Sequence, residues 1–540
     1  MAIDEKTYEE IAGASANTPD PERAQRNLLR FVELNPDKSP SPCFPIAARL
    51  FAVSRFLANY CIANPGELFA AIREIRSNIT KISLEERAGG LPGHKMDINH
   101  MMKALRLFKK QYLLRITLRD ITGETGIQSS MEELTLLAET IISISLKWSL
   151  RLNRQRFGKP ADSAITLIAL GKLGAEELNY SSDVDLIAVY DKEGGRTAGV
   201  PGPSGVRTNR ISNHEFYCRV VELFGKLLSS QTEDGIAYRV DLRLRPQGQR
   251  GEVALPLKAY RTYYESWGRT WERMALIRAR PAAGDIGLGK AFMEAIRPFV
   301  WRETVDYSEI EEIRGLKKKI DSTFARDDIK RGYGGIREAE FFVQTFQLLY
   351  GRANRHLRTH GTLDAIRVLR EMKMAPEEDL VTLRGNYLFL RRLEHYLQMK
   401  EDLQTHTLPP SDEETEVIAR SMGFPSKSDF LASLRLRRMQ TKNMYNSLLG
   451  TKEDVHAEAL NLLEGKLSDE ELSGYLSFRK VRHAGKCLIN MKNIREHMSA
   501  FRTMQERSLI REVMPRLLEN ALTAESPDRA LAGLESLLTT

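Results

Sequence analysis

The sequence predicts an α+β protein that is predominantly helical, with one compact α/β unit set between helical regions. Apolar residues recur at helical spacing from residue 20 to about 158, and again from about 290 to the end of the chain. Between these regions, short apolar runs bounded by turn residues are typical of strands. A chain of 540 residues is too long for a single hydrophobic core, so three or four domains are expected.

The first region, residues 1–158, is expected to be a helical bundle. Asp20 can cap a helix, Pro21 suits its first turn, and Glu22 complements its positive end, so a helix is predicted through Glu33. Further amphipathic runs include residues 46–64 and 131–156, whose apolar stripes can pack against one another.

The α/β unit, residues 159–288, contains the arrangement with the clearest chemistry. An apolar strand at 165–170 runs into a Gly-Lys-Leu-Gly turn, a short helix with glutamates follows, and a second strand opens with Asp183-Val184-Asp185. Because strand side chains alternate between faces, Asp183 and Asp185 point the same way, while Val184 and Leu186 point into the core. Two carboxylates held so close repel each other unless a cation lies between them. Magnesium prefers such oxygen ligands.

A third carboxylate follows in the segment 238–246, YRVDLRLRP. Alternation along this predicted strand places Arg239, Asp241, Arg243 and Arg245 on one face. An acid among three arginines suits a place where a metal ion and several phosphate oxygens are neutralised together. The alternative interpretation is a surface strand in which Asp241 pairs with neighbouring arginines.

Two further regions, 289–445 and 446–540, are predicted to be helical. Glycines at 332–335 interrupt the pattern, and a helix restarts at 336–344 with Arg337, Glu340 and Gln344 along one side and Phe341, Phe342 and Leu348 for packing. The segment 387–398 is interpreted as part of the bundle, with His395 as a packed histidine. A glycine- and proline-rich loop at 194–205 is either a mobile flap beside the site or an inert surface insertion.

Together, the strand, the glycine turn, the Asp-x-Asp strand and the later acid resemble the nucleotidyltransferase fold shared by polymerase beta and its relatives. Four phrases are similar, more closely, to the adenylyltransferase/adenylyl-removing enzymes of glutamine synthetase: GKLGAEELNYSSDVDLI (171–187), YRVDLRLRPQGQRGEVALP (238–256), WERMALIRARPAAGD (271–285) and GYGGIREAEFFVQ (332–344). Lys172 stands where the wider superfamily often has Ser or Gly, and this family is similar in having Lys there.

The resemblance implies an enzyme of nitrogen regulation with two similar halves, one removing AMP from a tyrosine of glutamine synthetase by phosphorolysis and the other attaching AMP from ATP. The wordings at 178–182 and 334–338 favour the removing half, and no second glycine turn with Asp-x-Asp follows residue 285, so the chain is interpreted as that first half. The last region, 446–540, then leads towards the absent second half.

The same resemblance implies a set of site residues, cofactors and partners. Two magnesium ions are expected at Asp183, Asp185 and Asp241, with phosphate as co-substrate and ADP as product. Phosphate and nucleotide are expected at Gly171, Lys172, Ser182, Arg239, Arg243 and Arg245, with support from Arg337, Glu338 and Glu340. Glutamine synthetase is the expected protein substrate, and the PII signalling protein an expected regulator.

Other functions remain open at this point. Adenylyl transfer from ATP to glutamine synthetase, or nucleotidyl transfer to a small molecule or an RNA 3′ end, uses the same carboxylate geometry. A non-catalytic, regulatory helical module requires the three acids to have no chemical role. A P-loop interpretation of residues 284–291 fails, because Ala291 lacks the hydroxyl that binds magnesium.

Composition indicates a cytoplasmic enzyme. The net charge of +8 arises from 80 basic and 72 acidic residues, which is typical of solvated helix faces, and nucleic acid is not an expected partner. No apolar stretch reaches the ~20 residues that a bilayer requires, so no membrane association is expected. Cys43, Cys61, Cys218 and Cys487 show no CxxC pair and no histidine at zinc spacing, so reduced, buried cysteines are expected.

Overall fold

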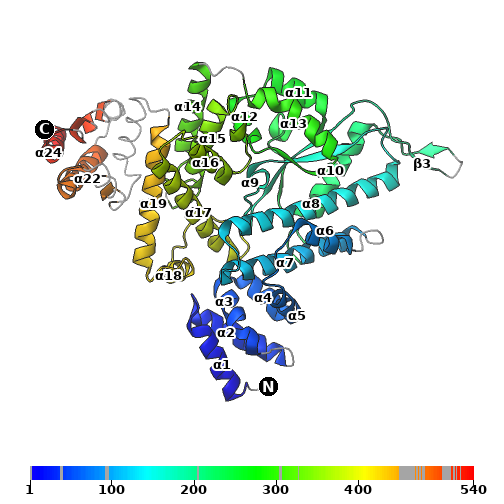
Figure 1. Cartoon of the computed structure of the whole chain (residues 1–540), viewed down its shortest axis with the longest axis horizontal. Helices are drawn as coiled ribbons and strands as arrows, with labels where there is room; N and C mark the ends of the chain where they lie inside the picture. Colours follow the sequence, from blue (N-terminus) through cyan, green and yellow to red (C-terminus); the bar gives the residue numbers. More distant parts are fainter. Residues whose placement is uncertain are drawn as a thin grey trace. The chain divides into compact units, whose positions relative to one another are not determined.

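The protein is predominantly helical with a small mixed sheet, as the sequence predicts (Figure 1). The computed structural model describes residues 3–36, 41–91, 97–202, 206–302, 307–325, 327–448, 481–500 and 524–539, with short stretches between 469 and 522. The chain forms two compact units. The first unit comprises Met1–Glu309, Val343–Pro376 and Arg391–Gly423, and the second comprises Ile310–Phe342, Glu377–Leu390 and Phe424–Thr540.

Eight α-helices precede the sheet in the described part of the first unit. They are α1 (Glu5–Ala16), α2 (Pro21–Leu34), α3 (Phe44–Val53), α4 (Arg55–Ala63), α5 (Pro65–Arg73), α6 (Lys81–Gly89), α7 (Ile98–Thr122) and α8 (Ile127–Phe157). The predicted start of α2 is confirmed, because the Asp20 side chain accepts a hydrogen bond from the Arg23 N–H, with Pro21 in the first turn. The run at 46–64 is two helices, since Ser54 ends α3 and its hydroxyl caps α4.

The sheet contains β1 (Ile165–Ala169), β2 (Val184–Tyr190), β5 (Val240–Asp241), β6 (Ala254–Pro256) and β7 (Arg280–Gly284). The strand order is β5-β2-β1-β7, and β6 also pairs with β2. β1 is antiparallel to β2 and β7, whereas β5 and β6 run parallel to β2. β5 lies beside the first residues of β2 and β6 beside the last, so one edge of β2 carries both short strands.

Alternation along β2 divides its side chains between the two faces of the sheet. Val184, Leu186 and Ala188 join an apolar cluster with residues of α7, α8 and α10 (Asn213–Ser229). On the opposite face, Tyr260 of α11 (Leu257–Ser266) donates a hydrogen bond to the Ala188 carbonyl, and α13 (Ile286–Val300) contacts β1 and β7. Helices therefore cover both faces, and the prediction that Val184 and Leu186 point into the core is confirmed.

Two local predictions within this unit are wrong. The Gly-Lys-Leu-Gly segment is itself a single helical turn, α9 (Gly171–Gly174), and no helix with glutamates follows it. The glycine-rich segment 194–205 was expected to be a loop but contains β3 (Val200–Pro201), which forms an antiparallel pair with β4 (Arg207–Thr208). Residues 203–205, between the two strands, lie outside the described part of the chain.

The remaining described helices are α12 (Thr270–Leu276), α14 (Tyr307–Ser322), α15 (Ile336–Tyr350), α16 (Thr362–Glu371), α17 (Glu377–Met399), α18 (Asp412–Ser421), α19 (Lys427–Ser447), α22 (Ala484–Ala500) and α24 (Pro527–Thr539). The predicted restart of the helix after the glycines is confirmed by α15, and Phe341, Phe342 and Leu348 are buried as expected. Among the described residues, no helix is both long enough and apolar enough to cross a membrane.

Arg106 on α7 is a buried charge that joins two elements of the first unit. Its guanidinium donates hydrogen bonds to carbonyl oxygens of Leu227, Ser230 and Gly235 at the end of α10 and just beyond it, as well as to Met102 of its own helix. The side chain is only 1% exposed. Replacing it leaves buried carbonyl oxygens without donors, which is costly in an apolar environment.

We predict that Arg106→Met destabilises the first unit by about 2 to 3 kcal/mol, because each unsatisfied buried carbonyl costs about 1 to 3 kcal/mol and the methionine recovers some packing. Chemical denaturation followed by hydrogen exchange at the end of α10 measures the effect. Lys103→Met, on the same helix, is the matched control, since Lys103 pairs only with exposed Glu233 and its loss should be nearly neutral. Equal stabilities of the two variants would contradict this role for Arg106.

Candidate active site

Two of the three predicted aspartates lie next to each other on neighbouring strands. Asp185 of β2 is the register partner of Asp241 of β5. Because the two strands are parallel, register partners project from the same face of the sheet, about 4.8 Å apart along the hydrogen-bonding direction. Asp183 immediately precedes β2, two residues from Asp185, and is partly exposed. The structure thus brings together carboxylates that are more than fifty residues apart in sequence.

Gly171 lies directly against the Asp185 side chain. A Cβ atom placed on Gly171 would lie 2.1 Å from Oδ2 of Asp185, and the residue has a φ of +55°, in the left-handed region that favours glycine. The neighbouring Leu170 N–H donates a hydrogen bond of 2.9 Å to the Asp185 carbonyl. The glycine is therefore required both by its backbone conformation and by the close approach of the carboxylate.

Arginines neutralise two of the aspartates. The Arg239 Nε lies 2.5 Å from Oδ1 of Asp183, and the Arg239 guanidinium also donates to the Ser181 carbonyl. Arg243 donates to both oxygens of Asp241 from its side chain and to Oδ1 from its backbone N–H. Burial raises the pKa of Asp241, but the hydrogen bonds and charge of Arg243 outweigh burial and leave that pKa below its ordinary value. The Asp241 carboxylate is therefore charged and paired with Arg243 at neutral pH.

The expected single strand through Arg245 is wrong, because β5 ends at Asp241 and a series of turns follows. Arg245 consequently leaves the face that carries Arg239 and Asp241. Its buried guanidinium donates instead to the carbonyl oxygens of Leu242, Gln249 and Gly251. Arg245 thereby holds together the loop that follows Asp241.

The buried hydroxyl of Ser182 also has a local partner. It accepts a hydrogen bond from the Asn179 N–H and so shapes the turn before Asp183. A role for Ser182 in binding nucleotide stays a prediction.

Lys172 has a partner that was not anticipated. Its ammonium lies 2.7 and 2.9 Å from the two carboxylate oxygens of Glu394, which is completely buried on α17. Arg391 Nε, at 3.1 Å, and His406 Nδ1, at 3.0 Å, contact the same carboxylate. Burial raises the pKa of Glu394, but Lys172, His406 and Arg391 together reverse that effect and place the pKa well below its ordinary value.

Further hydrogen bonds join α17 to the segment between α9 and β2. Arg391 donates to the Glu177 carbonyl and to the Asn179 side chain, and Gln398 accepts from the Ser181 N–H at 3.0 Å. Arg391, Glu394 and Gln398 were missed as functional residues. The available signal was their spacing of three and four residues along a helix whose other residues are mostly apolar, which is typical of a buried polar face. His395 is packed as predicted, with its ring edge-on to Tyr180.

The second unit contains the three predicted supporting residues on α15, Arg337, Glu338 and Glu340. Glu338 is buried. Its carboxylate forms an ion pair with the Lys442 ammonium at 2.8 Å and accepts a hydrogen bond from the Gly334 N–H. Glu340 accepts a hydrogen bond from the Tyr387 hydroxyl, and Arg337 donates to the Thr323 hydroxyl. These contacts support the fold of the second unit. That Arg337, Glu338 and Glu340 also support the catalytic residues stays a prediction.

One group of possible metal ligands was not expected. Among the described residues, His214, Cys218 and Glu252 are the one group of three histidine, cysteine or acidic side chains whose ligand atoms all lie within 4.8 Å of one another. The expectation that no histidine lies at zinc spacing from a cysteine is therefore wrong for Cys218, which follows His214 by four residues. The expectation of burial holds for Cys61 and Cys487, whereas Cys43 and Cys218 are partly exposed.

The arrangement of a glycine turn, an Asp-x-Asp strand and a neighbouring acidic strand is that of a nucleotidyltransferase, and comparison with known proteins supports this class. Residues 46–295 match the family model of glutamate-ammonia ligase adenylyltransferase. Residues 308–449 match that of GlnD PII-uridylyltransferase.

Curated relatives carry the name bifunctional glutamine synthetase adenylyltransferase/adenylyl-removing enzyme. The protein of Thioalkalivibrio sulfidiphilus is 34% identical over 91% of this chain and 52% of its own length. That of Hahella chejuensis is 32% identical over 92% of this chain and 53% of its own. That of Xanthomonas campestris pv. campestris is 35% identical over 80% of this chain and 46% of its own length. The chain is similar to these enzymes along most of its own length and spans about half the length of each relative.

We predict that Glu394→Gln destabilises the first unit by about 3 to 5 kcal/mol at pH 7, because Lys172 and Arg391 then remain as buried charges without their carboxylate. The wild-type contribution is fully present above the unfolded glutamate pKa of about 4.3 and is lost as pH falls towards the lower folded pKa. When the free energy of unfolding is measured from pH 7 to pH 3, the variant should therefore lose less stability on acidification than the wild-type protein.

Glu401→Gln serves as the control, because Glu401 pairs at 3.6 Å with an Arg55 side chain that is 69% exposed. Its loss should change stability by less than about 1 kcal/mol. A Glu394→Gln protein as stable as Glu401→Gln at pH 7 would contradict the role given to the buried carboxylate.

Proposed function

We propose that this chain removes AMP from adenylylated glutamine synthetase by phosphorolysis, producing ADP and the free tyrosine in the regulation of nitrogen assimilation. The observation that carries the proposal is the pairing of Asp185 with Asp241 against Gly171, inside the segment that matches the adenylyltransferase family. The names of the relatives include both directions of the reaction, transfer of AMP and its removal.

The charges around the aspartates favour removal. Arg239 and Arg243 each lie at hydrogen-bond distance from a carboxylate, and an arginine in that position can exchange a carboxylate oxygen for a phosphate oxygen. Phosphorolysis brings together two anions, inorganic phosphate and the AMP phosphate, so cationic groups at the site have a direct task. Phosphate is already an anion near pH 7 and needs little help from a general base. The similarity of the segments 178–182 and 334–338 to removing halves agrees with this direction.

The donor set fits magnesium. Asp183, Asp185 and Asp241 offer only oxygen ligands, and two of them project from adjacent positions on one face of the sheet. These three aspartates are the residues that would hold the ions. When bound, magnesium supplies charge neutralisation at the attacking and leaving oxygens. The arginines now on Asp183 and Asp241 are then free to bind phosphate oxygens.

The reaction is written as an in-line displacement at the AMP phosphorus. A phosphate oxygen forms a bond to that phosphorus while the bond to the tyrosine oxygen breaks, and the tyrosine oxygen takes up a proton from solvent. Arg239 and Arg243 orient the two phosphoryl groups. Gly171 leaves room for the Asp185 carboxylate, and Lys172 acts through Glu394 by fixing the turn that contains Gly171. Control of the enzyme by the PII protein stays a prediction from family resemblance.

We predict that Asp185→Asn lowers the rate of AMP removal by roughly a hundredfold or more, because the amide removes charge from the place where magnesium is expected. Gly171→Ala should produce a similar loss, since its Cβ would occupy the position of Asp185 Oδ2, 2.1 Å away. Initial rates of ADP release from adenylylated glutamine synthetase measure both effects.

Gly225→Ala is the matched control for the glycine variant. Gly225 lies within α10, nothing lies within 4 Å of an added Cβ, and the substitution should preserve activity while adding up to about 1 kcal/mol of helix stability. Folding of all three variants is checked by circular dichroism. Near-normal activity in folded Asp185→Asn would rule out the assignment of the aspartates.

We further predict that turnover requires inorganic phosphate and yields ADP in amounts equal to the AMP removed, because phosphate is the proposed attacking group. The purified chain is incubated with magnesium and adenylylated glutamine synthetase labelled in its AMP, with and without phosphate. In the converse assay, ATP and unmodified glutamine synthetase should give little incorporation of AMP. Efficient incorporation would instead identify the chain as the transferring half.

A further inference from the structure

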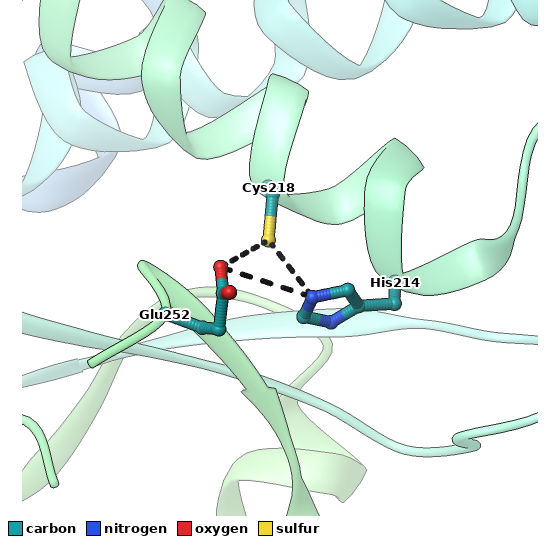
Figure 2. Close-up of side chains that lie close together, drawn as sticks. All are labelled: His214, Cys218 and Glu252. Atoms are coloured by element: carbon teal, nitrogen blue, oxygen red, sulfur yellow. Dashed lines mark hydrogen bonds and ion pairs between the residues drawn. The ribbon is translucent and has the colours of Figure 1, made fainter. Parts of the chain in front are cut away.

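A second candidate ligand site lies at the opposite end of β2 from the aspartates. His214 and Cys218 lie one turn apart at the start of α10, where residues four apart share a helix face. Glu252, in the segment that precedes β6, points towards them (Figure 2). Tyr190, the last residue of β2, lies five residues beyond Asp185, which corresponds to about 16 Å along an extended strand. This cluster is therefore separate from the aspartates.

The three ligand atoms form a nearly equilateral triangle. His214 Nε2 lies 3.8 Å from Cys218 Sγ, Cys218 Sγ lies 3.9 Å from Glu252 Oε2, and Glu252 Oε2 lies 3.8 Å from His214 Nε2. A tetrahedral zinc ion with bond lengths of about 2.3 Å to sulfur and about 2.0 to 2.1 Å to nitrogen and oxygen separates its ligands by roughly 3.3 to 3.6 Å. Shifts of a few tenths of an ångström thus suffice to bring the three atoms to that geometry.

The His214 ring is already oriented for binding a metal ion through Nε2. Its Nδ1 lies 3.1 Å from the hydroxyl of Tyr190, whose ring is buried and stacks on Tyr217 at 5.1 Å between centroids. In the tautomer with the proton on Nδ1, that nitrogen donates to the tyrosine, and the lone pair of Nε2 faces Cys218 and Glu252. Metal-binding histidines characteristically have such a partner on the second ring nitrogen, which fixes the ring and its tautomer.

We propose that His214, Cys218 and Glu252 bind a zinc ion, with solvent at the fourth position. The mixed nitrogen, sulfur and oxygen donors suit zinc and differ in kind from the oxygen-only donors of the three aspartates. The ion joins the start of α10 to Glu252, which lies near the C-terminal end of the segment between β5 and β6. The N-terminal end of that segment directly follows Asp241. That segment contains Arg243 and the loop held by Arg245, so the zinc ion fixes the end of the loop away from the active site.

The test uses the full-length chain, stripped of metal by a chelator and titrated with Co²⁺ in place of Zn²⁺. We expect one equivalent of Co²⁺ to produce the visible bands of a tetrahedral site and a near-ultraviolet sulfur-to-cobalt charge-transfer band, both abolished by added Zn²⁺. Cys218→Ser should lose the charge-transfer band. Cys43→Ser, which changes another partly exposed cysteine, should keep it.

Two milder variants keep the test decisive if Cys218→Ser fails to fold. Glu252→Gln changes a side chain that is 64% exposed, so the fold should survive while zinc affinity falls. Tyr190→Phe retains all three ligands and removes only the partner of Nδ1, which should weaken zinc binding about ten- to a hundredfold. Absence of a charge-transfer band in the wild-type protein, or unchanged zinc affinity in both Glu252→Gln and Tyr190→Phe, would overturn the proposal.

Discussion

The rest of the site depends on the ion pairs that the buried Glu394 carboxylate forms. It lies among Lys172, Arg391 and His406, and a single carboxylate removed from water is tolerable only with such compensation. Lys172 belongs to the turn α9, so the ion pair fixes that turn against α17. Gly171, the neighbouring residue, can then approach the Asp185 carboxylate more closely than any other residue type allows.

The active-site charges are balanced locally. Asp183 pairs with Arg239 and Asp241 with Arg243, so two of the three acids have an arginine beside them. Such pairs are stable without ligand and can rearrange when magnesium and phosphate bind, since a carboxylate can exchange an arginine for a metal ion and the arginine can exchange a carboxylate for a phosphate. Under the proposed function, the same residues serve both the free enzyme and the substrate-bound enzyme.

The sequence predicts the features that depend on short-range pattern. The strands around residues 165 and 184, the capped helix α2 and the restart of α15 after its glycines follow from alternation, capping and glycine punctuation. Features that depend on distant partners were not predictable. Periodicity alone extended β5 to Arg245, because the carbonyl oxygens that capture that guanidinium come from a loop with no pattern of its own. Likewise, no local pattern shows that Lys172 pairs with Glu394, which is more than two hundred residues away in sequence, and phosphate binding by Lys172 stays a prediction. The spacing of His214 and Cys218 was visible in the sequence, but Glu252 was not identifiable as their neighbour.

Under the proposed function, the three aspartates hold magnesium while Arg239 and Arg243 turn to phosphate oxygens. The most direct measurement is a crystal structure of the chain soaked with Mn²⁺, AMP and inorganic phosphate, with the ions located by anomalous scattering. We expect manganese bound by Asp185 and Asp241, with Arg239 or Arg243 hydrogen-bonded to phosphate oxygens. Phosphate and AMP bound elsewhere, with both arginines still paired to Asp183 and Asp241 and no manganese at the carboxylates, would contradict it.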